Sequence, residues 1–289
     1  MNIKYELSKL VPDRIYLKIF FKKLVGERLN LKTPETFNEK IQWLKLYDRN
    51  PQYTFMVDKI TAKEYVASVL GEEYIIPTLG VWDKFDDINF DKLPEQFVLK
   101  CNHDSGGLIV VRNKEQLDLE MAKTKIEKCL KRNYFYIGRE WPYKHVKPKI
   151  FAEKYLEAPH EGIRDYKFFN FNGVSKFIYI SEGLENHATA KISFFDFEGR
   201  QLPFKRLDYK PFEGNCVLPD NFERMHYLSD ELARQIGSAF VRTDFYSLNG
   251  NIYFSEITFS PCSGILPFDP PEWNKILGEW ISLPEKKRK

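Results

Sequence analysis

Two acidic residues, Asp244 and Glu256, occur in a segment whose other residues are typical of buried β-strands. The segment, RTDFYSLNGNIYFSEITFSPCSG, places aromatic and branched residues on both sides of an Asn-Gly turn, as a β-hairpin requires. A two-residue turn at Asn249-Gly250 would leave the two acids on opposite faces, whereas a three-residue loop would pair them directly. Opposed like charges are destabilising, so the second arrangement implies a cation between the carboxylates.

The three-residue register would also place Arg242 and Thr258 on the face of the two acids. Oxygen ligands without His or Cys suit Mg²⁺, which binds one or two carboxylates together with substrate phosphates. The hairpin therefore indicates a magnesium site. The alternative is a pair of surface acids on a solvated hairpin face.

A second polar group follows an apolar strand that ends at Lys100. The link NHDSGG, residues 102–107, carries two glycines, which let backbone N–H groups approach a phosphate closely. It lacks the GxxxxGK[ST] order, and no helix follows directly, so a P-loop NTPase is excluded. Its His103 could contact substrate or phosphate, or make only a hydrogen bond within the loop. An ordinary hairpin loop is the alternative for the whole link.

A third segment, KPKIFAEKYLEA, reads as an apolar strand that runs into Glu153. The edge of an extended strand can offer the backbone donors and acceptors that adenine requires. Any strand offers the same groups, so this segment alone does not identify a nucleotide site.

The whole chain of 289 residues is 43% hydrophobic and 29% charged, which is a globular composition. No apolar run approaches the ~20 residues of a membrane span, and the N-terminus lacks a signal-peptide pattern. The four cysteines show no C-x-x-C spacing, which favours free thiols and a cytoplasmic protein. The net charge of +3 is too small to indicate nucleic acid as a partner. The basic end, EKKRK, is either a solvated terminus or a weak contact with an anionic polymer or membrane surface.

Hydrophobic periodicity predicts an α+β fold with largely antiparallel sheets and a mainly helical N-terminal region. The first helix is expected to start at Pro34 with Thr33 as its cap, and the second to end before Gly71. We divide the chain into residues 1–71, 72–150 and 151–289. Further elements are expected over residues 97–100, 108–112, 149–156, 166–180 and 190–200 as strands, and over 117–132 and about 229–240 as helices.

In their order and spacing these segments resemble the ATP-grasp superfamily. The closer resemblance is to the TupA-like ATP-grasp proteins of bacterial surface-polysaccharide clusters. It runs from about residue 30 to 270 and includes TPETFNEKIQWLKLYDRNP, FVLKCNHDSGG, AEKYL, RDYKFFNFNG and the hairpin segment. The resemblance implies an ATP-grasp fold, with residues 72–150 carrying the phosphate-binding lid and residues 151–289 the adenine hinge and the Mg²⁺ hairpin.

The resemblance also assigns roles in binding ATP. Lys59 and Lys100 hold its phosphates under a lid of Ser105, Gly106 and Gly107. Glu153, Lys154 and Leu156 form the adenine hinge. Asp165 lies where the superfamily places a ribose-binding acid, and Lys167 could reach a phosphate.

At the reacting phosphate, Asp244 and Glu256 correspond to the Mg²⁺ ligands. Thr258 stands where the superfamily usually has Asn, and a hydroxyl binds Mg²⁺ more weakly than an amide carbonyl. Arg242 and Lys100 are the implied catalytic residues, because they would stabilise charge on the transferring phosphoryl group.

The implied activity is that of an ATP-dependent carboxylate–amine ligase that works through an acyl phosphate. The expected substrates are an amino acid and a uronic acid of a capsular or cell-surface polysaccharide, or the sugar precursor of that polymer. Ser260, Ser263 and Gly264 are candidates for positioning the acceptor. Arg139 and Trp141 could bind sugar, or could belong to a packed aromatic loop.

Two alternatives remain open at this point. A glycosyltransferase of polysaccharide assembly would need a nucleotide-sugar site, commonly a D-x-D motif after a βαβ series, and the sequence shows neither. A degenerate nucleotide binder would not need Lys100, Arg242, Asp244 and Glu256.

Overall fold

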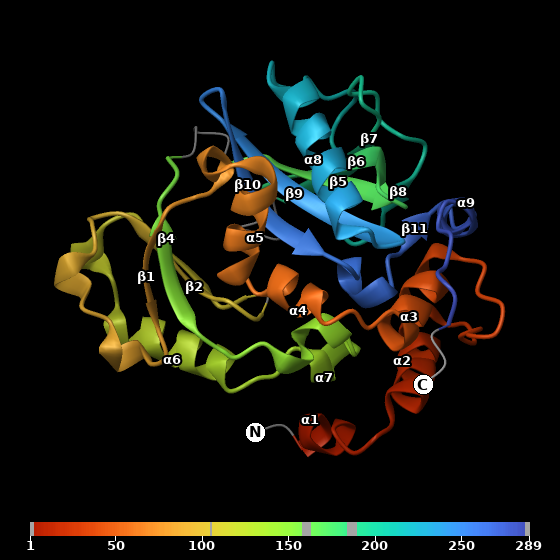
Figure 1. The fold of residues 1–289 in the computed structure, drawn as a ribbon, viewed down its shortest axis with the longest axis horizontal. Coiled ribbons are helices and arrows are strands. Elements are labelled where there is room, and N and C mark those ends of the chain that lie inside the picture. The colour runs from red at the N-terminus through yellow and green to blue at the C-terminus, as the bar shows by residue number, and fades with distance from the viewer. Residues whose placement is uncertain (1–2, 105, 158–162, 184–189, 287–289) are drawn as a thin grey trace.

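The computed structural model describes residues 3–104, 106–157, 163–183 and 190–286. Two antiparallel sheets dominate the fold and lie on either side of the helices α4 (Gln52–Val57) and α5 (Thr61–Leu70) in Figure 1. The predicted α+β class is confirmed, and so are the largely antiparallel sheets.

The N-terminal region is helical, as expected. Its first helices are α1 (Ile3–Ser8), α2 (Asp13–Val25) and α3 (Phe37–Tyr47). The predicted start of α3 at Pro34 is wrong, because Thr36 caps the helix and shares a capping box with Glu39. The helix α5 ends before Gly71, as predicted, but begins at Thr61.

The first sheet has four strands in the order β1-β4-β2-β3. The helix α6 (Leu119–Leu130) covers one face, where its Ile126 packs against alternate strand residues such as Leu99 and Ala152. The other residues of the strands, among them Lys100, point to the opposite face, because side chains alternate along a strand. The strands are β1 (Thr78–Trp82), β2 (Phe97–Cys101), β3 (Leu108–Val111) and β4 (Ile150–Lys154).

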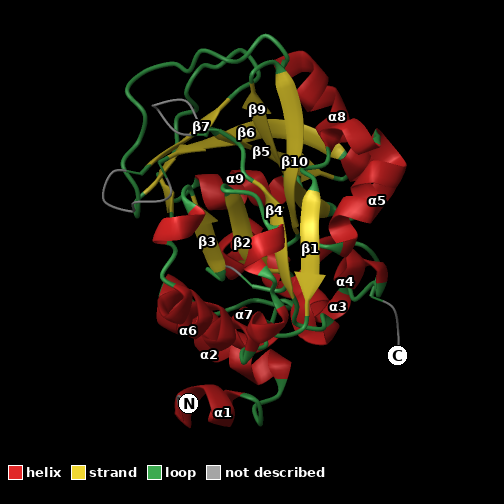
Figure 2. Ribbon diagram, turned by 90° about the vertical axis from the view of Figure 1, so that its left-hand side faces the viewer, coloured by secondary structure: helices red, strands yellow, loops and turns green. Residues whose placement is uncertain are grey.

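The second sheet has five strands in the order β10-β9-β5-β6-β7. A two-stranded ribbon of β8 and β11 (Figure 1), the long helix α8 and the short helices α7 and α9 complete the molecule (Figure 2). These elements are β5 (Asp165–Phe171), β6 (Val174–Glu182), β7 (Lys191–Phe195), β9 (Phe240–Leu248), β10 (Asn251–Thr258), the ribbon β8 (Lys205–Arg206) with β11 (Phe268–Asp269), α7 (Phe135–Gly138), α8 (Phe222–Ile236) and α9 (Trp273–Glu279).

Both faces of the five-stranded sheet are covered, but in different ways. Helices α5 and α8 bury one face, where Phe168 and Phe245 belong to a continuous core. On the other face, α2, α3 and α9 cover an aromatic half that includes Phe169 and Phe240. On this same face, the other half of β5 and β9 carries charged residues instead of aromatic ones. These charged residues form the site described below.

The division of the chain into three regions remains a prediction. The four-stranded sheet takes its strands from Thr78 to Lys154, because β4 pairs with β1 and β2. Residues 151–154 therefore share a sheet with the region expected to end at residue 150.

Candidate active site

The hairpin β9–β10 brings Asp244 and Glu256 opposite each other by a route that neither predicted register contains. The turn at Asn249-Gly250 has two residues, both at positive φ, and pairs Leu248 with Asn251. A β-bulge between Phe254 and Glu256 then shifts the register, so that Glu256 pairs with Asp244. A bulged residue changes which face the next side chain occupies. Phe254 therefore stays in the core, while Glu256 joins the face of Asp244.

Asp244 is completely buried and accepts hydrogen bonds from two cationic side chains. Arg242 grips it with two bonds, from Nε to Oδ1 at 2.7 Å and from Nη2 to Oδ2 at 2.6 Å. Arg242 Nη2 also lies 3.4 Å from Glu256 Oε2 and 3.1 Å from Thr258 Oγ1. The guanidinium of Arg242 thus contacts the three other side chains that were predicted for this face.

Lys167, on the neighbouring strand β5, supplies the second cation. Its ammonium group contacts Asp165 and donates to Asp244 Oδ2 at 3.1 Å. Burial, reinforced by the charge of Asp244, raises the pKa of Asp165 to about 6 although Lys167 acts in the opposite direction. The structure therefore brings Asp165 and Lys167 into the same charged cluster as the hairpin acids.

On the four-stranded sheet, the buried carboxylate of Glu153 holds two lysines. Lys100 forms an ion pair with Glu153 Oε2, and Lys63 Nζ lies 2.6 Å from Oε1. Burial alone would raise the pKa of Glu153, but the two ammonium groups lower it below its ordinary value. Burial opposes the charge of Lys100, yet Glu153 raises the pKa of this lysine, which remains a cation.

The analysis of the sequence missed Lys63. Its ammonium group also donates to the backbone oxygen of Ile76 and to Thr78 Oγ1, which fixes α5 against the edge of the first sheet. Nothing in the spacing marks Lys63, because Lys59 precedes α5 and contacts different groups.

Lys59 connects the two sheets. Its Nζ donates to the backbone oxygen of Asp104 at 2.8 Å and lies 3.7 Å from Glu256 Oε1. The glycine loop after β2 is therefore joined through one lysine to an acid of the hairpin. Gly106 and Gly107 follow in this loop, and Ser105 lies outside the described residues.

His103 has a structural role in this loop. Its ring is buried, and Nε2 lies 3.2 Å from the backbone oxygen of Cys129 and 3.1 Å from that of Arg132. The Arg132 side chain also binds the buried carboxylate of Asp104, and Gly107 N donates to that carboxylate. The imidazole thus anchors the loop to the end of α6.

The expected adenine hinge lies at the end of β4. Glu153 turns its side chain to the two lysines, while the side chain of Lys154 is exposed and its N–H donates to the backbone oxygen of Pro77. Leu156 is half-buried just beyond the strand.

The segment after β10 takes an unusual backbone path. Cys262, Ser263 and Gly264 all have positive φ, of 48°, 53° and 70°. Two buried side chains of α3 hold this turn: Lys45 Nζ donates to Ser263 O at 2.8 Å, and Gln42 Nε2 donates to Gly264 O at 2.7 Å. Ser260 is buried at the start of the turn.

Ser263 links two buried charged residues, Lys45 and Glu140, neither of which was a candidate from the sequence. Ser263 Oγ donates to Glu140 Oε1 at 2.7 Å, and Glu140 is buried. Burial lowers the pKa of Lys45 to about 7 although Glu140 acts to raise it. Burial likewise raises the pKa of Glu140. Lys45 and Glu140 are far apart in the chain, so only the tertiary fold brings both of them to Ser263.

Arg139 and Trp141 do not join the cluster. Arg139 is 1% exposed and donates to the backbone oxygens of Ser8 and Val11, so it fastens the N-terminal helices and has no surface for a sugar. Trp141 lines a separate pocket near His145. We therefore remove Arg139 from the candidate substrate-binding residues.

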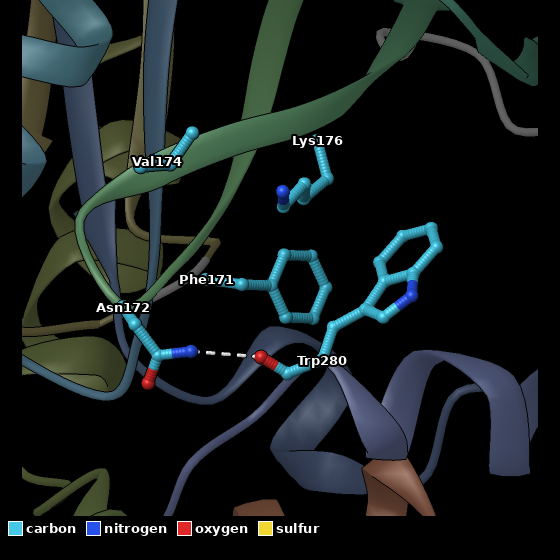
Figure 3. Close-up of a pocket in the computed structure, with 5 residues that line it drawn as sticks. All are labelled: Phe171, Asn172, Val174, Lys176 and Trp280. Carbon is cyan, nitrogen blue, oxygen red and sulfur yellow. Dashed lines mark hydrogen bonds between the residues drawn. The ribbon is translucent and has the colours of Figure 1, made fainter.

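Another hollow, of about 500 Å³, lies at the far end of β5 (Figure 3). Phe171, Asn172, Lys176 and Trp280 line it, and Asn172 Nδ2 donates to Trp280 O at 2.8 Å. The charged cluster begins at the other end of the strand, at Asp165 and Lys167, so this hollow does not belong to the site.

The hairpin acids fit a hard divalent cation by their chemistry. Asp244, Glu256 and Thr258 offer oxygen atoms only, as Mg²⁺ prefers. Asp244 accepts three bonds from Arg242 and Lys167, and a carboxylate has about four lone-pair sites, so one remains for a metal. Within the described residues no group of three or more His, Cys, Asp or Glu could hold a metal. Mg²⁺ commonly binds one or two carboxylates and completes its coordination with water and substrate phosphates.

Comparison with known proteins places this site in a family. The model of the TupA-like ATPgrasp family matches residues 39–282. No curated protein matches the sequence. No helix among the described residues is long and apolar enough to cross a membrane.

Several solved structures are similar over most of the chain. A D-alanine–D-alanine ligase from Bacillus anthracis complexed with ATP is 18% identical, with 78% of this chain and 65% of that chain covered and a TM-score of 0.46. The corresponding ligase from Helicobacter pylori is 19% identical, with coverages of 79% and 63% and a TM-score of 0.46. An L-amino acid ligase from Bacillus licheniformis is 14% identical, with coverages of 88% and 57% and a TM-score of 0.46. The present chain thus spans less than two thirds of the length of these enzymes.

The family match extends from α3 to the end of the core and includes both sheets and every charged residue of the cluster between them. The chain therefore belongs to the TupA-like ATP-grasp family and has the ATP-grasp fold.

Proposed function

We propose that the protein is an ATP-dependent ligase that joins a carboxylate to an amine. One observation carries the proposal: each sheet presents a charged face, and Lys59 lies between them. The face of the first sheet is formed by Lys100 and Glu153. The face of the second is formed by Arg242, Asp244 and Glu256, and Lys59 contacts this Glu256 and the loop of the first sheet. Cations from both sheets suit a polyphosphate, and the paired acids suit the metal that accompanies it.

In this proposal, ATP lies between the sheets with its phosphates at Lys59 and Lys100. The backbone of the loop at Gly106 and Gly107 closes over the phosphates, and the backbone of residues 154–156 receives the adenine. Glu153 contributes by holding Lys100 rather than by touching the base, since its carboxylate is already paired. Asp165, which is bonded to Lys167, is the candidate for the ribose.

The reaction follows from the poor leaving ability of a carboxylate oxygen. The carboxylate attacks the γ-phosphorus, the bond to the β,γ-bridging oxygen breaks, and ADP leaves. An amine then attacks the carbonyl carbon of the acyl phosphate, the carbon–oxygen bond to phosphate breaks, and the nitrogen loses a proton to water. Arg242 and Lys100 stabilise the charge on the transferring phosphoryl group.

Mg²⁺ bound at Asp244 and Glu256, with Thr258 as a weaker third ligand, would neutralise phosphate charge and orient the γ-phosphoryl group. Arg242 already bridges both acids and Thr258. This residue would keep the acids in place for the ion and leave its remaining N–H groups for phosphate.

We further propose that the carboxylate belongs to a uronic acid of a capsular or cell-surface polysaccharide, or of its sugar precursor, and that the amine is an amino acid. Support comes from the resemblance of the sequence to TupA-like ATP-grasp proteins of bacterial surface-polysaccharide clusters. The turn Ser260–Gly264 follows the metal strand directly, so its backbone and hydroxyls are the candidates for positioning the acceptor. Trp141 remains a candidate for contacting sugar from its separate pocket.

The reaction is assigned to the cytoplasm because it consumes ATP. The four cysteines support this assignment, because all of them are free thiols in the described structure.

A thermal-shift comparison tests the nucleotide class. ATP with Mg²⁺ should raise the melting temperature, and UDP-sugars with Mg²⁺ should not. Stabilisation by UDP-sugars alone would reject the ligase in favour of a glycosyltransferase.

The substrate pair needs a separate experiment. Enzyme, ATP with Mg²⁺, a uronic-acid glycan and a mixture of amino acids should give a product whose mass equals the sum of the two substrates minus water. Formation of ADP that requires neither substrate would reject this pair and leave the nucleotide site standing.

A further inference from the structure

The N-terminal helices α1 and α2 expose an unusual amount of aliphatic surface. Five of the sixteen exposed large apolar side chains among the described residues fall within residues 7–24, with 51% to 81% of their surface accessible. They are Leu7, Leu10, Ile15, Ile19 and Leu24. We call Leu7, Leu10, Ile15 and Ile19 the N-terminal apolar surface; Leu24 follows Ile15 by nine residues and so lies on the other side of α2.

The inner face of α2 is already used for the core, so the exposed residues form a second face. Leu17 and Phe21 are buried against the sheet. Ile15 and Ile19 are four residues apart and lie together on the opposite side of the helix. Core packing therefore does not explain these two isoleucines.

Basic residues surround the N-terminal apolar surface. Residues 1–28 contain seven lysines and arginines and three acids, a net charge of +4, while the whole chain carries only +3. Of the three acids, Asp13 forms ion pairs with Arg49 and Arg139, which belong to the body of the protein. The outward charge next to Ile15 and Ile19 comes from exposed residues, namely Arg14, Lys18, Lys22 and Lys23.

The helices that carry this surface are fixed to the body of the protein. Arg139 donates to the backbone oxygens of Ser8 and Val11, and Tyr16 Oη donates to Ile137 O at 2.7 Å. Tyr5 exchanges two hydrogen bonds with the backbone of Asn133. Figures 1 and 2 both place α1 at the lower end of the molecule, with α2 just above it. The aliphatic side chains are thus presented at one end by a rigid support.

We propose that α1 and α2 bind the surface of an anionic lipid bilayer. Aliphatic side chains surrounded by lysine and arginine are the composition of helices that lie in the membrane interface. The apolar residues would enter the boundary between headgroups and acyl chains, and the basic residues would contact the anionic headgroups.

Charge argues against the other occupants of this surface. A second copy of the chain would oppose two patches of net charge +4. A nucleic acid would pair with the lysines but would leave the aliphatic side chains of this surface in water. An anionic bilayer satisfies both parts of the surface.

The test is co-sedimentation of the full chain with vesicles of equal parts phosphatidylglycerol and phosphatidylcholine, and with phosphatidylcholine vesicles alone, in 100 mM salt. We expect binding to the anionic vesicles, with a loss at 500 mM salt because the charges are screened. Lys18→Gln with Lys22→Gln and Lys23→Gln should weaken binding on the order of 100-fold. Ile15→Glu with Ile19→Glu should reduce binding to background.

Val217→Glu is the matched control, because Val217 is an aliphatic residue that is 85% exposed outside this surface. Melting curves should show all variants folded. Absence of binding by the wild type, or an equal loss in Val217→Glu, would overturn the proposal. A dimer in sedimentation velocity that dissociates in Ile15→Glu with Ile19→Glu would also overturn it, by assigning the surface to a second copy.

Discussion

The two acids of the hairpin have the same proposed role but very different surroundings. Asp244 is fully buried and holds Arg242 and Lys167, whereas the side chain of Glu256 is 29% exposed and has weaker contacts. Loss of one member of a buried ion pair leaves an uncompensated charge and is strongly destabilising. Substitution of Asp244 should therefore reduce both stability and activity, whereas substitution of Glu256 should reduce mainly activity.

We predict that Asp244→Asn loses ATP turnover and about 3 kcal/mol of the free energy of unfolding. Glu256→Gln should lose turnover with a change in stability of about 0.5 kcal/mol or less, since exposed pairs contribute little. Denaturant unfolding and ADP release measure both effects. Full ATP-dependent activity in both variants would contradict the assignment of these acids to the metal.

The burial of Lys45, which lowers its pKa to about 7, predicts a dependence of stability on pH. Native Lys45 loses its proton near pH 7, whereas the unfolded chain keeps it to about pH 10.5. Because the unfolded state binds more protons in this interval, Lys45 makes the free energy of unfolding rise with pH. Removal of Lys45 also removes the charge that lowers the pKa of Glu140, so the variant should lose stability as pH rises.

The difference in unfolding free energy between wild type and Lys45→Met should accordingly increase from pH 7 to pH 9. Denaturant titrations at the two pH values give this difference, and other titrating groups largely cancel in it. A difference that stays constant or shrinks would show that Lys45 remains protonated in the folded protein.

At the level of single residues, a charged side chain could be recognised as a site candidate where it stands within or at the end of an apolar strand. Lys100 ends an apolar strand, and Asp244 interrupts one, so both were conspicuous. Lys45, Lys63 and Glu140 were not, because each acts through a partner that only the tertiary fold brings near. Arg139 was misjudged, since an aromatic-rich loop around an arginine fits a buried clamp as well as a sugar site.

Among the elements, the hairpin shows most clearly where prediction from sequence ended. The structure has the two-residue turn at Asn249-Gly250, which was expected to place the two acids on opposite faces. It also has Asp244 paired with Glu256, which was expected only with a three-residue loop. The structure combines them through the bulge between Phe254 and Glu256. A bulge depends on how both strands pack against their neighbours, and the hydrophobic pattern of one strand does not contain this information.

The glycine loop after β2 gives a prediction at this scale. A β-carbon at Gly107 would lie 2.8 Å from Asp104 Oδ1 and 2.8 Å from Cys101 Sγ, whereas Gly106 has open space but a φ of 116°. Gly107→Ala should destabilise the protein by about 1–3 kcal/mol, through overpacking of the loop base. Gly106→Ala should cost about 1 kcal/mol through backbone strain alone.

Both substitutions should weaken ATP binding, because each alters the loop that approaches phosphate. Calorimetric titration with ATP and Mg²⁺ measures the affinity, and thermal unfolding measures the stability. Wild-type affinity in both variants would identify the loop as an ordinary connection between β2 and β3.

At the level of the whole molecule, we propose that ATP binds between the two sheets and contacts both of them. Lys59 already connects these sheets without nucleotide. The order of motifs along the chain was sufficient to predict this fold class, because both sheets are built from nearby segments. The way in which the two charged faces combine was not predictable, since it depends on how the sheets pack around α4 and α5.

Binding of ATP should therefore stabilise the molecule as a unit. At a concentration 100 times the Kd, ATP with Mg²⁺ should add about 2.7 kcal/mol, and the melting temperature should rise by about 5 °C. Lys100→Ala should remove most of this shift. Lys176→Ala is the control and should keep it, because Lys176 is an exposed lysine of β6 at the hollow outside the site. Equal shifts in the two variants would place the nucleotide elsewhere.

The most direct test of the ligase mechanism follows the oxygen atoms of the carboxylate. A uronic acid labelled with ¹⁸O at both carboxyl oxygens is incubated with the enzyme, ATP, Mg²⁺ and an amino acid, and the released phosphate is analysed by mass spectrometry. Because the acyl phosphate carries one carboxylate oxygen on its phosphorus, the account predicts one ¹⁸O atom in each phosphate released with product. Phosphate that forms together with the condensed product but carries no label would contradict the acyl phosphate, and with it the central claim.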